Sequence, residues 1–167
     1  MHHIYHTHGF ILSSRNSGEA NKVFAIYTRE MGLVRATSQG VRLAKSKLRF
    51  TLQDFSYAKI DLVRGKEIWR VTSATNITSF PYARSDRQSL LLIARIGKLI
   101  ERLCDGEEES GKIFDEFIQA LYLLDDSTIA STTREALELH LVLRIMNSLG
   151  YIGDSEILYQ YLSTPFN

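Results

Sequence analysis

The residues of this sequence best suited to chemistry form a short cationic run. Four Lys or Arg side chains fall within eight residues, separated only by neutral residues: Arg42, Lys45, Lys47 and Arg49. No acidic residue occurs between Glu30 and Asp54. Lys and Arg at this density neutralise phosphates and release counterions, which produces an affinity that depends on salt and little on base sequence. The run, together with Arg35 before it, predicts contacts to a phosphate backbone; the alternative is a solvated loop that only aids solubility.

Aromatic residues accompany these cations in the first eighty residues. Seven rings are candidates for stacking on bases: Tyr5, Phe10, Tyr27, Phe50, Phe55, Tyr57 and Trp69. A single-strand platform needs rings on which bases stack beside cations that follow the backbone. Because a small domain must also fill its own interior, we expect one to three of these rings at the surface, with Phe55 and Tyr57 undecided.

The two halves of the chain carry opposite charge. Residues 1–82 hold twelve Lys or Arg against five Asp or Glu, and residues 83–167 hold eight against fourteen. A basic half suggests a polyanionic partner, although uneven charge also arises by chance in small domains. We therefore predict a basic domain over residues 1–80 and an acidic domain over residues 81–167.

The pattern of the first eighty residues is that of strands. Five runs rich in β-forming residues, bounded by turn signals, are expected strands: Ile4–Ser13, Asn21–Thr28, Leu33–Gln39, Arg49–Val63 and Lys66–Thr78. The second run is apolar on both faces, which indicates burial on both sides. Closure into a small barrel removes the exposed edges of so short a sheet.

Near Pro81 the spacing of apolar residues changes from that of strands to that of helices. Ser85 with Gln88 and Thr132 with Glu135 have the form of capping boxes. The expected helices are Arg87–Leu103, one that follows Glu107–Glu109 and runs to Leu124, one that ends at Leu149 before Gly150, and a last one capped by Asp154. Their apolar stripes predict a helical bundle, so the fold class is α+β, a barrel followed by a bundle.

Composition excludes several classes of protein. No apolar run approaches the roughly 18 residues of a membrane-spanning helix, and the start of the chain lacks the order of a secretory signal. Cys104 is the single cysteine, which suits a cytosolic protein. Nucleotide-binding, hydrolase and metalloprotease motifs are missing, so we expect no enzyme and no cofactor. Four histidines near the start are an expected edge or flexible cluster rather than a metal site: His2, His3, His6 and His8.

An ordered set of segments is similar to the RecO family of bacterial recombination mediators. The matching segments are Gly18–Phe24, Tyr27–Ala36, Gly40–Arg42, Lys45–Arg49, Leu52–Phe55, Trp69–Ala74 and, more weakly, Leu137–Tyr151. The resemblance implies an N-terminal OB-fold followed by helices, in the cytoplasm and at the nucleoid of a bacterium. It also implies binding of single- and double-stranded DNA, annealing of complementary strands, and cooperation with RecR and RecA.

The resemblance further implies a site for the acidic, apolar C-terminal tail of single-stranded DNA-binding protein. Such a site needs an apolar groove with a cation at one end, and we assign it to Arg95, Lys98 and Arg102. Many members of the family carry cysteine pairs with zinc-ligand spacing after a Leu-Gly-Tyr segment, whereas this chain has none there. Functions that depend on that portion are therefore left open. Two other functions also remain, an adaptor that binds proteins through its helices and an OB-fold that binds RNA.

Overall fold

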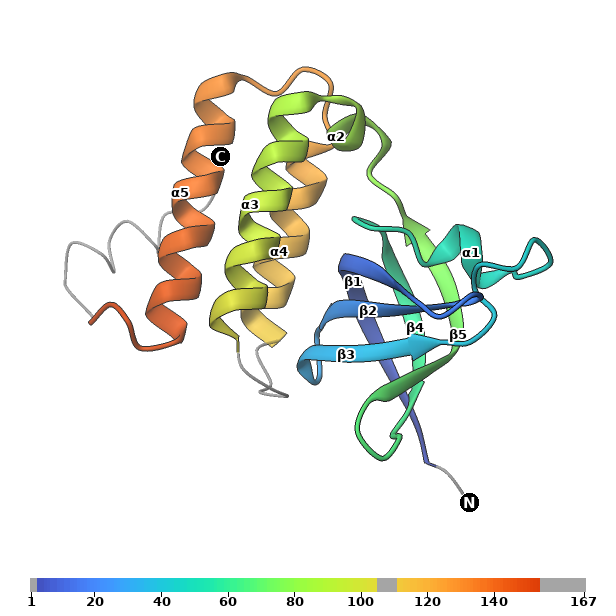
Figure 1. Ribbon diagram of the computed structural model, residues 1–167. Helices are drawn as coiled ribbons and strands as arrows, with labels where there is room; N and C mark the ends of the chain where they lie inside the picture. The colour runs from blue at the N-terminus through green and yellow to red at the C-terminus, as the bar shows by residue number, and fades with distance from the viewer. Residues whose placement is uncertain (1–2, 105–110, 154–167) are drawn as a thin grey trace.

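The computed structural model describes residues 3–104 and 111–153. Within these residues the chain forms a barrel of strands followed by a group of helices, which Figure 1 shows as two adjacent lobes. The elements follow in the order β1 (Ile4–Ser17), β2 (Asn21–Thr28), β3 (Gly32–Ser38), α1 (Leu48–Thr51), β4 (Tyr57–Val63), β5 (Trp69–Thr78), α2 (Pro81–Ser85), α3 (Arg87–Leu103), α4 (Gly111–Leu124) and α5 (Ser131–Ser148). The predicted α+β class, with strands first and helices second, is confirmed.

The five strands close into a barrel in the order β1-β2-β3-β5-β4. Strand β1 pairs antiparallel with both β2 and β4, and β5 pairs antiparallel with β4. The join between β3 and β5 is parallel and short, with Ala36 beside Trp69 and Thr37 beside Arg70. A five-stranded barrel is the architecture of the OB-fold, so the predicted barrel is confirmed.

One expected strand, over residues 49–63, is wrong in its first half. There α1 and a turn precede β4. Ser56 holds this turn, since its hydroxyl donates to the carbonyl oxygens of Thr51 at 2.9 Å and Gln53 at 2.6 Å. These local hydrogen bonds replace a strand ladder, so the β-forming residues before Ser56 do not lengthen β4. The other strands differ from the prediction only at their ends.

Strands β1 and β2 are apolar on both faces because each face packs on a different core. Side chains alternate across a strand. Those that point into the barrel include Ile11, Phe24 and Ile26, which are buried with residues of the other strands. Those that point outward pack against the helices: Phe10, Leu12, Ala25 and Tyr27. The burial on both sides predicted for β2 is therefore confirmed.

Helix α4 supplies the ring that joins the helices to the barrel. The centroid of Phe117 lies 5.1 Å from that of Phe10 and 6.0 Å from that of Tyr27. One apolar core thus runs from the outer face of the barrel into the helices. The change from strands to helices falls between β5 and α2, whereas the division into domains 1–80 and 81–167 stays a prediction.

The N-termini of the helices are capped differently from the prediction. Ser85 is the last residue of α2, and Asp86 caps α3 by accepting a hydrogen bond from the Ser89 N–H at 2.8 Å. That bond lowers the pKa of the Asp86 carboxyl. Helix α5 begins after Ala130, which forms no side-chain cap. Both expected capping boxes are therefore wrong, and the helix starts at Glu107–Glu109 and Asp154 lie outside the described residues.

The C-terminus of α5 is as predicted, with Gly150 ending the helix. Gly150 has φ +75°, the left-handed conformation that glycine adopts without a steric penalty. Its N–H donates to the Asn147 carbonyl, and the Tyr151 N–H donates to the Met146 carbonyl, both at 2.9 Å. These two bonds form the Schellman motif, which satisfies the last carbonyl groups of a helix.

His140, on α5, makes the stability of the protein depend on pH. Burial lowers the pKa of its imidazole; the charge of Glu116 acts in the opposite direction and that of Arg144 in the same one. Unfolded histidine takes up a proton below about pH 6.5, and the buried ring resists protonation. The unfolded state then binds more protons, so the free energy of unfolding falls as the pH drops below this value.

We expect His140→Gln to remove this contribution to the pH dependence. One proton accounts for at most about 1.4 kcal/mol per pH unit. Urea unfolding of the parent and the variant at about pH 7 and about pH 5 measures the difference. An equal loss of stability in both proteins on acidification would show that His140 is not the responsible group.

Candidate nucleic-acid interface

The basic segment, residues Gly40–Phe50, runs from the end of β3 into α1 and is tied to the turn between β1 and β2. The Gly40 N–H donates to Asn21 Oδ1 at 2.9 Å, and the Arg42 N–H donates to the Ala20 carbonyl at 3.0 Å. The Arg42 guanidinium also reaches the Gly18 carbonyl at 3.1 Å. These bonds hold the start of the segment against the barrel, so its cations project from an anchored loop.

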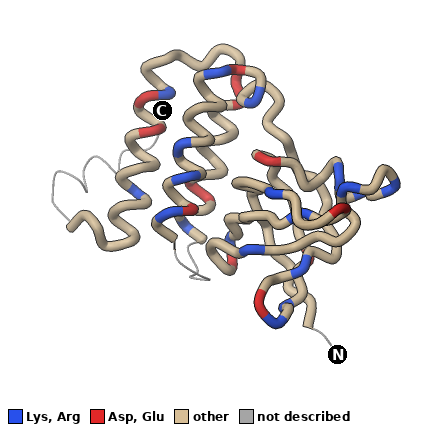
Figure 2. The backbone as a smooth tube through the Cα atoms, in the orientation of Figure 1, with Lys and Arg blue, Asp and Glu red and all other residues tan. Residues whose placement is uncertain are grey.

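All five predicted phosphate contacts are exposed. The side chains concerned are Arg35 on β3 and, on the basic segment, Arg42, Lys45, Lys47 and Arg49. Figure 2 shows cations gathered on the loop beside α1, on the side of the barrel away from α3, α4 and α5. The basic segment therefore presents its charge to solvent, where a phosphate backbone can reach it.

Two of the seven candidate rings are exposed, which agrees with the expected one to three. Phe50 is 72% exposed at the end of the basic segment, and the Arg49 guanidinium carbon lies 5.9 Å from its ring centroid. Tyr5, at the start of β1, packs edge-on against Trp69 with centroids 5.0 Å apart. Phe55 and Tyr57 are partly buried against the shared core. Phe50 is thus the ring best placed beside the predicted phosphate contacts.

A cavity of about 560 Å³ lies beside the basic segment and extends to α2. Its polar and charged lining residues are Lys22, Arg42, Arg49, Gln53, Asp54 and Arg84. The lining combines residues of β2, the basic segment, the turn before β4, and α2. The sequence-based prediction did not include Lys22 or Arg84 among the phosphate contacts. Arg84 lies in the acidic half of the chain, and no basic run around it indicates a role in binding phosphate. Arg35 does not line this cavity.

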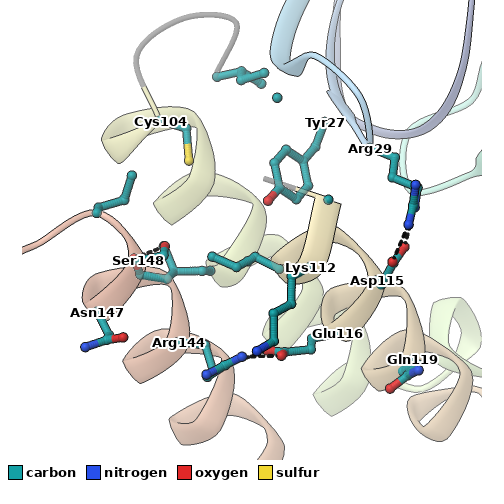
Figure 3. A pocket seen from close by; sticks show the side chains of 16 residues that line it. Tyr27, Arg29, Cys104, Lys112, Asp115, Glu116, Gln119, Arg144, Asn147 and Ser148 are labelled. Atoms are coloured by element: carbon teal, nitrogen blue, oxygen red, sulfur yellow. Dashed lines mark hydrogen bonds and ion pairs between the residues drawn. The ribbon is translucent and has the colours of Figure 1, made fainter. Parts of the chain in front are cut away.

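A larger cavity, of about 900 Å³, lies between the barrel and helices α4 and α5 (Figure 3). Two of its three cations, Arg29 and Arg144, are paired with carboxylates; the third is Lys112. Arg29 forms a bidentate ion pair with Asp115 at 2.8 and 2.9 Å, and the Asp115 hydrogen bond raises the pKa of Arg29. Arg144 is paired with Glu116. This lining holds three cations and two carboxylates, whereas the smaller cavity has four cations and one carboxylate. The larger cavity is therefore less suited to phosphate than the smaller one.

The three cations assigned to a partner tail lie exposed on α3, but one of them is engaged. Both terminal oxygens of Glu138 accept hydrogen bonds from Arg95, at 2.6 and 2.7 Å, and this pairing raises the pKa of Arg95. Lys98 and Arg102 are exposed on the same helix. The assignment to these three residues stays a prediction.

Two other kinds of site are absent from the described residues. No helix within residues 3–104 and 111–153 is both long and apolar enough to cross a membrane. In the same part of the chain, no group of three or more His, Cys, Asp or Glu side chains is placed to hold a metal ion.

Comparison with known proteins agrees with the barrel. Residues 1–80 match the family model for the recombination protein O N terminal domain. Over 140 residues the chain is 31% identical to the DNA repair protein RecO of Dehalococcoides mccartyi, a match that covers 84% of this chain and 55% of the relative.

Two further relatives are also DNA repair proteins RecO. The DNA repair protein RecO of Desulfitobacterium hafniense is 27% identical over 150 residues, covering 89% of this chain and 52% of the relative. That of Clostridium perfringens is 30% identical over 122 residues, covering 73% and 50%. The chain spans about half the length of the curated relatives it matches.

Proposed function

Because this chain belongs to the RecO family, we propose that it binds DNA in recombinational repair, through the basic segment. The observation that carries this proposal is the combination of four exposed cations with the exposed ring of Phe50 on a loop anchored to the barrel. The cations neutralise phosphates and release counterions. A base can stack on Phe50, an interaction that tolerates any base.

Annealing of complementary strands follows from the same surface and needs no covalent chemistry. Two phosphate backbones repel one another, and a cationic surface lowers that repulsion while base pairing supplies the free energy. The protein therefore acts as a binding protein and not as an enzyme. It binds both single- and double-stranded DNA, since each presents phosphates to the basic segment.

The partners of such a mediator are RecR, RecA and the acidic tail of single-stranded DNA-binding protein, in the cytoplasm and at the nucleoid of a bacterium. Support for the tail site is limited to the exposed cations Lys98 and Arg102 on α3, with Arg95 beside them. A tail carboxylate would compete with Glu138 for the Arg95 guanidinium. These protein partners bind to the helical lobe.

Titration of labelled single-stranded DNA at several salt concentrations tests the proposed binding. Each phosphate contact to a single strand contributes about 0.7 to the slope of log affinity against log salt, so four contacts weaken binding about 50-fold between 50 and 200 mM salt. Fluorescence anisotropy measures the affinity. A peptide nucleic acid of the same base sequence, which has no phosphates, is the matched ligand control.

Two outcomes contradict the proposal. Absence of binding at 50 mM salt would leave a protein-interaction adaptor. Equal affinity for the peptide nucleic acid would show that phosphates are not what the protein recognises. Tighter binding of an RNA strand than of DNA would instead assign the same surface to RNA.

A further inference from the structure

We propose that the cavity between the basic segment and α2 is a subsite for backbone phosphates, in which Arg84 extends the DNA contact onto the helical lobe and Asp54 weakens it. This inference rests on the proposed DNA binding and specifies how the strand is held. It adds three residues to the interface: Lys22, Asp54 and Arg84.

The lining of the cavity favours an anion. Four cations, Lys22, Arg42, Arg49 and Arg84, face one carboxylate, that of Asp54. Arg42 and Arg49 belong to the basic segment, so the cavity is continuous with the exposed phosphate contacts. Its volume of about 560 Å³ accommodates more than a single phosphate, which suits a stretch of sugar–phosphate backbone passing from the basic segment toward α2.

Arg84 is presented by a firmly positioned turn of helix. The N–H groups of Tyr82 and Ala83 donate to Asp125 Oδ1, at 2.8 and 3.0 Å, and the Arg84 N–H donates to the Phe80 carbonyl at 3.0 Å. Ala83 is fully buried in the shared core. A half-buried arginine on such a support loses little freedom when it binds a phosphate, and guanidinium groups suit phosphate geometry.

Asp54 is the one acidic residue that lines the cavity. Its Oδ1 atom is buried and has no hydrogen-bond partner. A buried polar atom without a partner is unfavourable, and such groups in folded proteins call for an explanation in terms of function. Here the carboxylate lies where it repels a bound phosphate. An annealing protein must release the duplex that it helps to form, and a carboxylate in the phosphate subsite speeds that release by lowering affinity.

Three single substitutions test the subsite in the full chain. We expect Arg84→Gln to lower the salt slope for single-stranded DNA by about 0.7, the contribution of one contact, and Arg84→Lys to retain it. We expect Asp54→Asn, which keeps the shape of the side chain, to tighten binding about fivefold at 50 mM salt. Lys112→Gln, which removes an exposed cation from the start of α4, is the matched control and should leave the slope unchanged.

The outcomes separate this inference from the proposed function. If the parent binds DNA but Arg84→Gln behaves like Lys112→Gln, the strand does not reach α2 and the subsite is wrong. Weaker or unchanged binding by Asp54→Asn would likewise overturn the role of Asp54. Failure of the parent itself to bind DNA would remove the proposed function and the subsite together. Thermal unfolding monitored by circular dichroism checks that each variant remains folded.

Discussion

Replacing Arg42, Lys45, Lys47 and Arg49 together by glutamate is expected to weaken binding of single-stranded DNA on the order of 1000-fold at 50 mM salt. The substitution removes four phosphate contacts and adds four repulsive charges, and the salt slope should fall by about 2.8. All four side chains are exposed, so thermal stability should change little. Anisotropy titrations of the variant and parent from 50 to 200 mM salt measure both the affinity and the slope.

A matched variant separates local contacts from the charge of the whole protein. Lys98 and Arg102 are exposed cations on α3 that do not line the cavity beside the basic segment. Their combined replacement by glutamate should reduce affinity only through the weak long-range field, which salt screens within about 10 Å at 0.1 M. A loss as large as that of the quadruple variant would mean that DNA binding is not localised on the basic segment.

Phe117→Ala is expected to lower the free energy of unfolding by about 3–5 kcal/mol. Phe117 is buried and packs against Phe10 of β1 and Tyr27 of β2. Its loss leaves a cavity at the join between the helices and the barrel. Because both lobes line that cavity, the barrel and the helices should be destabilised together.

Two probes of one urea titration distinguish coupled from separate unfolding. Trp69, in the barrel core, reports the barrel by fluorescence, and circular dichroism near 222 nm reports the helices. Both transitions should shift by the same amount in Phe117→Ala. Leu123→Ala, an exposed apolar position on the same helix, is the control and should cost well under 1 kcal/mol. A barrel transition that does not move would show that the barrel is stable without the helices.

The alternation of apolar residues was enough to predict the barrel strands, including burial of β2 on both faces. It could not predict that the second face packs on α4, because the partner of an apolar face is chosen by tertiary packing. The error over residues 49–55 has a different origin. Phe50 and Thr51 favour strands, but the hydrogen bonds of Ser56 favour a turn. Strand propensity alone does not include the energy of those hydrogen bonds.

The site was predictable to the extent that it is local in sequence. Four cations within one loop are visible as a run, and the structure places all of them at the surface. Arg84 comes 35 residues after Arg49, in the acidic half, and joins the cavity only because tertiary folding brings α2 near the basic segment. The helix cap illustrates the same limit at short range, since Ser85 and Asp86 are both good capping residues and the length of α2 decides between them.

The short parallel seam between β3 and β5 makes this join the weakest in the barrel. It contains two paired positions, whereas the other neighbouring strands pair over seven or eight. We therefore expect local opening of the native state to begin where β3 meets β5, at Ala36 and Thr37. The basic segment begins just after β3. DNA held there, as proposed, should restrain this strand and slow the exchange of its amide hydrogens with solvent.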